Sequence, residues 1–117
     1  MTLKYFKKSE FACKCGCGVN KVSSELISLL DKARGKAGIP FKINSGYRCE
    51  NHPLTKDNPT SSHALGLAAD IKCTDSKSRA IMMDALVALD FERFGIGKSF
   101  IHADIDSEKP TPRIWVY

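Results

Sequence analysis

The chain has 117 residues, of which 43% are hydrophobic and 26% charged, and its formal net charge is +5. This length corresponds to one domain over residues 1–117, and the composition excludes wholesale disorder. The longest apolar runs are too short for a membrane-spanning helix. The opening residues, MTLKYFKKSEF, lack the apolar stretch of a secretory signal, so we expect synthesis in the cytoplasm. The mild basic excess favours anionic partners such as nucleic acid or cell-wall polymers.

The first part of the chain predicts an irregular arm, a helix and a short strand. Residues 1–22 are expected to be irregular, because cysteine, glycine and asparagine residues punctuate them. Apolar residues recur at helical spacing over 26–37, with Ser23 suited to cap the helix and Gly38 suited to end it. Apolar and polar residues then alternate over 41–45, which predicts a strand.

The second part predicts a long loop, a helix and three more strands. Residues 46–64 are rich in glycine, proline, asparagine and serine, and a loop of this length is usually functional. Asp75 or Ser76 is expected to cap a helix with an apolar stripe over 81–89. The strands are expected at residues 68–73, 100–105 and 113–117. This order indicates an α+β fold, a small and mostly antiparallel sheet with two main helices on one face.

Histidine and aspartate residues are placed where a metal site could form. Of the three histidines, His52 has no assignable role, whereas His63 ends the long loop and His102 lies in an expected strand. A catalytic zinc takes three protein ligands and keeps one position for water. His63, Asp70 and His102 can supply those ligands. Spacing alone leaves open an interpretation without a metal. In it, His63 is a loop histidine, Asp70 is a capping or ion-paired carboxylate, and His102 is a hydrogen-bonded core histidine.

Four motifs together resemble a known family. The sequence SxHxxGxAxD covers residues 61–70, and an apolar strand with HAD at 102–104 follows it. SGYR stands at 45–48, and SEFAC stands at 9–13. This set closely resembles the zinc D-Ala-D-Ala carboxypeptidase family, which includes peptidoglycan peptidases of bacteriophages. The resemblance covers about residues 5–117, and it implies a hedgehog/DD-peptidase-like fold.

The resemblance implies a zinc metallopeptidase that cleaves peptidoglycan stem peptides. The activity would be that of a D-Ala-D-Ala carboxypeptidase or of an endolysin-type endopeptidase. One Zn²⁺ would be held by His63, Asp70 and His102. The protein would be a monomer without a nucleic-acid or membrane partner, and it would reach the cell wall after export, lysis or virion delivery.

Two further residues would face the substrate by the same resemblance. Arg48 would contact it with a guanidinium fork, which suits a carboxylate or a carbonyl oxygen. Ser61 would hydrogen-bond near the substrate. From the residues alone, Arg48 could instead form a salt bridge with Glu50 or Asp57, and Ser61 could be a simple turn serine.

One position departs from the family's pattern. Many members carry Glu or Asp three residues before the last histidine as general base, but this chain has Ser99 there. Asp104 is the expected substitute, either as general base or as the residue that orients His102. The departure favours an alternative function, a non-catalytic zinc-binding phage tail or cell-wall-binding protein. A nucleic-acid-binding domain is less favoured, because lysine and arginine are scattered along the chain.

The chain has five cysteines, an odd number. Cys13, Cys15 and Cys17 form CxCGC, whereas Cys49 and Cys73 lie far along the chain. The odd number and the absence of a secretion signal argue against a disulfide scaffold. Packed free thiols or a single Cys13–Cys49 contact are favoured over a second, structural zinc on Cys13, Cys15, Cys17 and Cys49. We expect Cys13 and Cys49 to lie close together.

Overall fold

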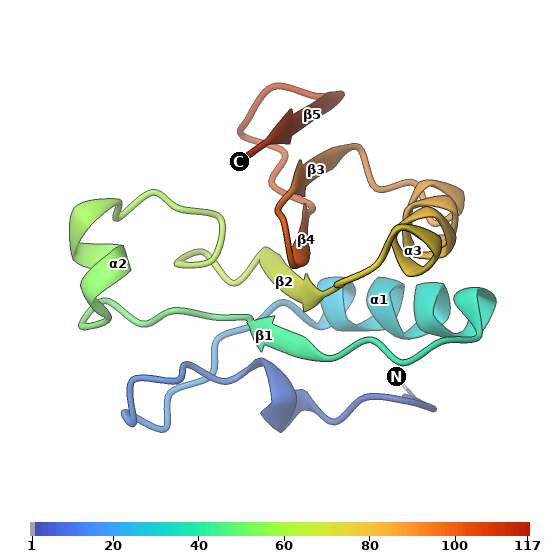
Figure 1. The fold of residues 1–117 in the computed structure, drawn as a ribbon. Coiled ribbons are helices and arrows are strands. Elements are labelled where there is room, and N and C mark those ends of the chain that lie inside the picture. The colour runs from blue at the N-terminus through green and yellow to red at the C-terminus, as the bar shows by residue number, and fades with distance from the viewer. Residues whose placement is uncertain (1) are drawn as a thin grey trace.

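A computed structural model describes residues 2–117, and Figure 1 shows how its elements are arranged. The strands are β1 (Ile43–Ser45), β2 (Ala68–Lys72), β3 (Arg93–Ile96), β4 (Phe100–Asp104) and β5 (Arg113–Val116). The helices are the 3-10 helix η1 (Lys8–Phe11) and the α-helices α1 (Ser24–Ala37), α2 (Pro53–Asp57) and α3 (Ser76–Ala88). No helix within residues 2–117 is both long and apolar enough to cross a membrane.

The strands form one sheet in the order β1-β2-β4-β3-β5. Every neighbouring pair is antiparallel except β3 and β5, which run parallel. Asp70 on β2 stands opposite His102 on β4, and His102 stands opposite Gly95 on β3. The predicted α+β class and mostly antiparallel sheet are confirmed, and the register brings two of the predicted ligands together.

Local signals explain the two long helices. The Ser23 hydroxyl accepts a hydrogen bond from the Leu26 N–H at the start of α1, and Gly38 ends that helix in the left-handed region with φ of +69°. The Asp75 carboxylate accepts from the Ser78 N–H at the start of α3. The two helices pack against each other, and Figure 1 shows them side by side. Their buried residues share one apolar core with the strands.

Two elements differ from the expected order. Strand β3 was not predicted, because its four residues include Gly95, which weakens a strand pattern. Helix α2 lies inside the expected loop, and its five residues are too few to show a helical period. Pro53 stands at its first turn, and the His52 side chain accepts a hydrogen bond from the Leu54 N–H. His52 therefore caps a helix, whereas the sequence placed it in a plain loop.

The N-terminal arm is irregular apart from η1, as predicted, and two glycines of the site loops fit closely against it. A Cβ atom at Gly46 would lie 2.6 Å from the Phe11 carbonyl oxygen. Gly66 has φ of +75°, and a Cβ there would overlap the Lys21 carbonyl oxygen. The Ser23 N–H donates to the Gly66 carbonyl over 2.8 Å. The arm therefore supports both segments that flank the predicted metal site.

Asp31 on α1 holds the beginning of the arm. Its buried carboxylate accepts hydrogen bonds from the backbone N–H groups of Lys4, Tyr5 and Phe6 over 2.8–3.1 Å. Burial raises the pKa of Asp31, but these N–H groups and Arg34 outweigh burial and hold it below its ordinary value.

Asp31→Asn is expected to destabilise the fold at neutral pH by about 1–3 kcal/mol, because the ionised acceptor of three N–H groups is lost. A carboxylate with a lowered folded-state pKa stabilises the fold above its unfolded pKa, and this contribution disappears as pH falls through the folded pKa. The difference in melting temperature between wild type and variant should therefore be full at pH 7 and shrink below about pH 4. A difference that is the same at both pH values would contradict this account.

Candidate metal centre

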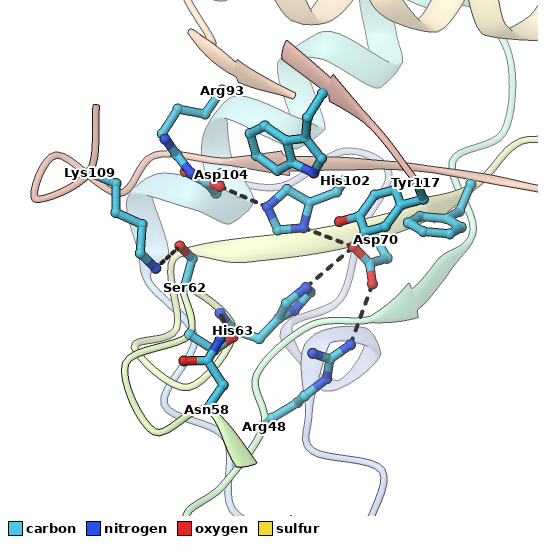
Figure 2. Close-up of a pocket in the computed structure, with 13 residues that line it drawn as sticks. Arg48, Asn58, Ser62, His63, Asp70, Arg93, His102, Asp104, Lys109 and Tyr117 are labelled. Atoms are coloured by element: carbon cyan, nitrogen blue, oxygen red, sulfur yellow. Dashed lines mark hydrogen bonds and ion pairs between the residues drawn. The ribbon is translucent and has the colours of Figure 1, made fainter. Parts of the chain in front are cut away.

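A cavity of about 380 Å³ opens beside the sheet, and Figure 2 shows the side chains around it. Strands β2 to β5 supply part of its lining, and the segments that follow β1, α2, β4 and β5 supply the rest. The lining contains imidazoles and carboxylates (His63, Asp70, His102, Asp104), cations (Arg48, Arg93, Lys109), polar side chains (Asn58, Ser61, Ser62) and aromatic rings (Phe100, Trp115, Tyr117). The cavity is thus charged on one part of its surface and aromatic on another.

The three predicted ligands converge in this cavity. Asp70 Oδ1 lies 3.0 Å from His102 Nδ1 and 3.3 Å from His63 Nε2. Their ligand atoms all lie within 4.8 Å of one another. A tetrahedral zinc with N and O donors at about 2.0–2.1 Å places neighbouring donors about 3.3 Å apart. The donor set and its spacing therefore fit zinc.

The second nitrogen of each imidazole is also held. His63 Nδ1 lies 2.8 Å from the Gly46 carbonyl oxygen, and His102 Nε2 lies 2.7 Å from Asp104 Oδ2. When these nitrogens carry the proton, His63 Nε2 and His102 Nδ1 present lone pairs toward Asp70. Such partners fix the ring orientation and tautomer of metal-binding histidines.

The charges of the site favour a cation at this point. Burial raises the pKa of Asp70, but hydrogen bonds with His102 and His63 outweigh burial and hold it well below its ordinary value. Burial lowers the pKa of His102, but hydrogen bonds to Asp104 and Asp70 outweigh burial and raise it. The carboxylates thus stabilise positive charge between them, which a proton or a metal ion can supply.

Asp104 contacts His102 with one carboxylate oxygen and other groups with the second. Its side chain is fully buried, and Oδ1 accepts hydrogen bonds from Arg93 Nε at 2.8 Å and from the Asp106 N–H at 3.1 Å. The expected placement of Asp104 on the same side of β4 as His102 is therefore seen. Of the two roles expected for it, these contacts favour orientation of His102 over general-base chemistry.

Arg48 and Ser61, which were expected to face a substrate, both line the cavity. The Arg48 guanidinium pairs with Asp70 Oδ2 at 3.4 Å (Figure 2). It also donates to the Ser45 hydroxyl at 3.1 Å. Its ion-pair partner is therefore Asp70, and not Glu50 or Asp57. The Ser61 hydroxyl accepts a hydrogen bond from the His63 N–H at 3.2 Å, so it also shapes the loop that carries this histidine.

Several residues that line the cavity were not predicted from the sequence. The buried hydroxyl of Ser62 donates to Asp106 Oδ2 at 2.7 Å, and Lys109 pairs with the same carboxylate at 3.0 Å. Arg93 lies over the Trp115 ring, and that ring packs against His102. The Ser62 contact joins residues that lie far apart in the sequence, and Arg93 stands in the unpredicted strand β3, so the sequence gives only a weak signal for these contacts.

Comparison with known proteins assigns the family. The family model described as Peptidase M15 matches residues 4–105. The chain belongs to the peptidase M15 family. No curated protein and no solved structure is found to match this chain. The M15 peptidases are zinc-dependent metallopeptidases, and the cluster of His63, Asp70 and His102 agrees with that chemistry.

Asp104→Asn is expected to lower zinc affinity at this M15 site by about 10–100-fold, because the variant loses the charged partner of His102. Competition with a chromogenic chelator measures the zinc affinity. His63→Ala removes one ligand of this site, so the ion that this variant lacks is the one to be followed. Asp57→Asn makes the same chemical change on the exposed surface of α2 and should leave the affinity unchanged. Unchanged affinity in Asp104→Asn together with lost turnover would instead identify Asp104 as the general base.

Proposed function

We propose that this M15 protein is a zinc-dependent peptidase that cleaves peptidoglycan stem peptides, as a D-Ala-D-Ala carboxypeptidase or as an endolysin-type endopeptidase. The observation that carries the proposal is the convergence of His63, Asp70 and His102 in one cavity, beside the guanidinium of Arg48. When bound there, zinc would polarise a scissile carbonyl and make water a stronger nucleophile at neutral pH. The substrate would lie in the cell wall, which the protein would reach after export, lysis or virion delivery.

The residues around the ligands suit a short peptide with a free carboxylate. The planar fork of Arg48 can bind a carboxylate or a carbonyl oxygen, and Ser45 and Asp70 hold it in the cavity. Trp115, Tyr117 and Phe100 provide an aromatic wall that can pack against the peptide's apolar atoms. A stem peptide that ends in D-alanine offers both features.

Asp104 is assigned here to positioning His102. Asp70 and Asp104 are the carboxylates that line the cavity within residues 2–117. Asp70 contacts both imidazoles and the Arg48 guanidinium, and Asp104 contacts His102 and Arg93. Ser99, at the position of the usual family acid, is exposed and does not line the cavity. This shortage of available carboxylates is the specific observation that favours the second candidate, a zinc-binding phage tail or cell-wall-binding protein without catalysis.

Digestion of defined muropeptides, followed by mass spectrometry, tests both candidates. Loss of a terminal D-alanine would show a carboxypeptidase, and internal cleavage would show an endopeptidase. His63→Ala is the matched control, because it removes one ligand of the candidate site. Intact muropeptides after incubation with zinc-loaded wild type, together with retention on purified cell walls, would select the binding protein.

Arg48→Lys should lower turnover of the cleaved muropeptide by tenfold or more, which corresponds to about 1.4 kcal/mol in the barrier. Lysine keeps the charge but loses the two-pronged hydrogen bonding. Zinc content and melting temperature should stay near wild type. Arg113→Lys, at an exposed position on β5, is the control and should retain full turnover. A large fall in the melting temperature of Arg48→Lys would point to a structural role instead.

A further inference from the structure

Four of the five cysteines come together at a second place in the molecule. The sulfur atoms of Cys13, Cys15, Cys17 and Cys49 all lie within 4.8 Å of one another. The Sγ atom of Cys15 lies 3.4 Å from that of Cys13 and 3.3 Å from that of Cys49. The predicted closeness of Cys13 and Cys49 is confirmed, since the Cys49 N–H donates to Cys13 Sγ at 3.3 Å. The fifth residue, Cys73, is buried elsewhere in the core.

The spacing of these sulfurs matches a metal site better than a disulfide. A disulfide requires sulfurs about 2.05 Å apart, and all five cysteines are free thiols. A tetrahedral zinc with sulfur ligands at about 2.3 Å places neighbouring sulfurs about 3.8 Å apart. Four sulfurs grouped at nearly this spacing supply a complete tetrahedral ligand set.

The backbone of the arm is shaped to bring three of these sulfurs together. Residues two apart on an extended strand point to the same side but lie about 6.6–6.8 Å apart along the strand. Gly16 and Gly18 have φ of +93° and +74°, so the CxCGCG segment curls where an extended strand would keep the cysteines apart. A Cβ at either glycine would meet no atom within 4 Å, so the requirement is the backbone angle and not space.

Backbone N–H groups also point at the sulfurs. Besides the bond from Cys49 to Cys13, the Val19 N–H donates to Cys17 Sγ at 3.3 Å. Sulfur accepts such bonds more strongly as a thiolate, because the acceptor is then charged. Two independent segments therefore offer both the ligands and the donors that stabilise them.

We propose that Cys13, Cys15, Cys17 and Cys49 hold a second zinc ion, with a structural role. Four thiolates fill the tetrahedral positions and leave none for water, which is the pattern of structural sites. The usual CxxC spacing is absent. In this chain the left-handed backbone at Gly16 and Gly18 curls the segment so that the sulfurs of its cysteines come together. Binding converts the thiols to thiolates and releases their protons. This site shares no ligand with the histidine cluster and does not depend on the proposed peptidase function.

The cysteine site lies between the N-terminal arm and the segment that carries Arg48. Cys49 directly follows Arg48, whose N–H donates to the His63 carbonyl over 3.1 Å. Cys13 to Cys17 belong to the arm, which packs on Gly46 through Phe11. A zinc ion here would join the arm to the segment that carries Arg48. It would thereby hold the backbone from which the Arg48 side chain reaches into the cavity.

Zinc content tests the proposal on the full chain, purified in reductant and reconstituted with Zn²⁺ alone. Elemental analysis should find two zinc ions per wild-type chain and one in His63→Ala. The double variant Cys15→Ser/Cys17→Ser, which changes two exposed residues, should also hold one. Cys73→Ala, which removes the cysteine outside the cluster, should keep both. Cobalt-loaded His63→Ala should show sulfur-to-cobalt charge-transfer absorption, and the double cysteine variant should not.

A measurement on wild type alone covers the case in which the cysteine variants do not fold. Titration with a mercurial reagent should release one zinc ion to a chromogenic chelator while the histidine-bound ion stays. The proposal is overturned if wild type and a folded double cysteine variant hold equal zinc, or if cobalt-loaded His63→Ala lacks the sulfur band. It is also overturned if thiol modification of wild type releases no zinc. Failure of the muropeptide assay would leave each of these results unchanged.

Discussion

The carboxylate of Asp70 is the interaction on which the cavity depends. It stands on β2 directly opposite His102 on β4, so the sheet register fixes one contact. Its two oxygens together reach His102, His63 and Arg48, which come from three separate parts of the chain. Burial of this carboxylate is tolerated because cationic and hydrogen-bonding groups surround it. Without its charge, the imidazoles and the guanidinium would lose their common partner.

Behind these contacts, further groups fix the direction of each side chain. The Gly46 carbonyl orients His63, and Asp104 orients His102. Arg93 in turn contacts Asp104 and covers the Trp115 ring, which packs on His102. The site is therefore held by strands as well as loops, and rigid supports of this kind keep ligands in place before a metal arrives.

The sequence could predict the parts of this arrangement that are local or carry a specific motif. Ser23 caps α1 as predicted, and Asp75, one of the two residues expected to cap α3, does so, because a cap acts within its own turn. His63, Asp70 and His102 could be predicted as candidate metal ligands because the motif at 61–70 and the later HAD segment mark them, and the structure brings them together. The alternation of side chains along a strand placed Asp104 on the same face as His102. It could not show that the Asp104 carboxylate would contact the His102 imidazole directly. Strand β3 was missed, so Arg93 could not be foreseen as a partner of Asp104.

Gly66 lies inside the metal-binding motif, yet its lack of a side chain serves the arm, since a Cβ would overlap the Lys21 carbonyl oxygen. Its own carbonyl receives the Ser23 N–H. The loop of His63 and the docked arm therefore share a close contact and a hydrogen bond. Any preference of a bound ion for this loop shape would be shared with the arm, and linkage would then make docking of the arm and occupancy of the histidine cluster strengthen each other by the same factor.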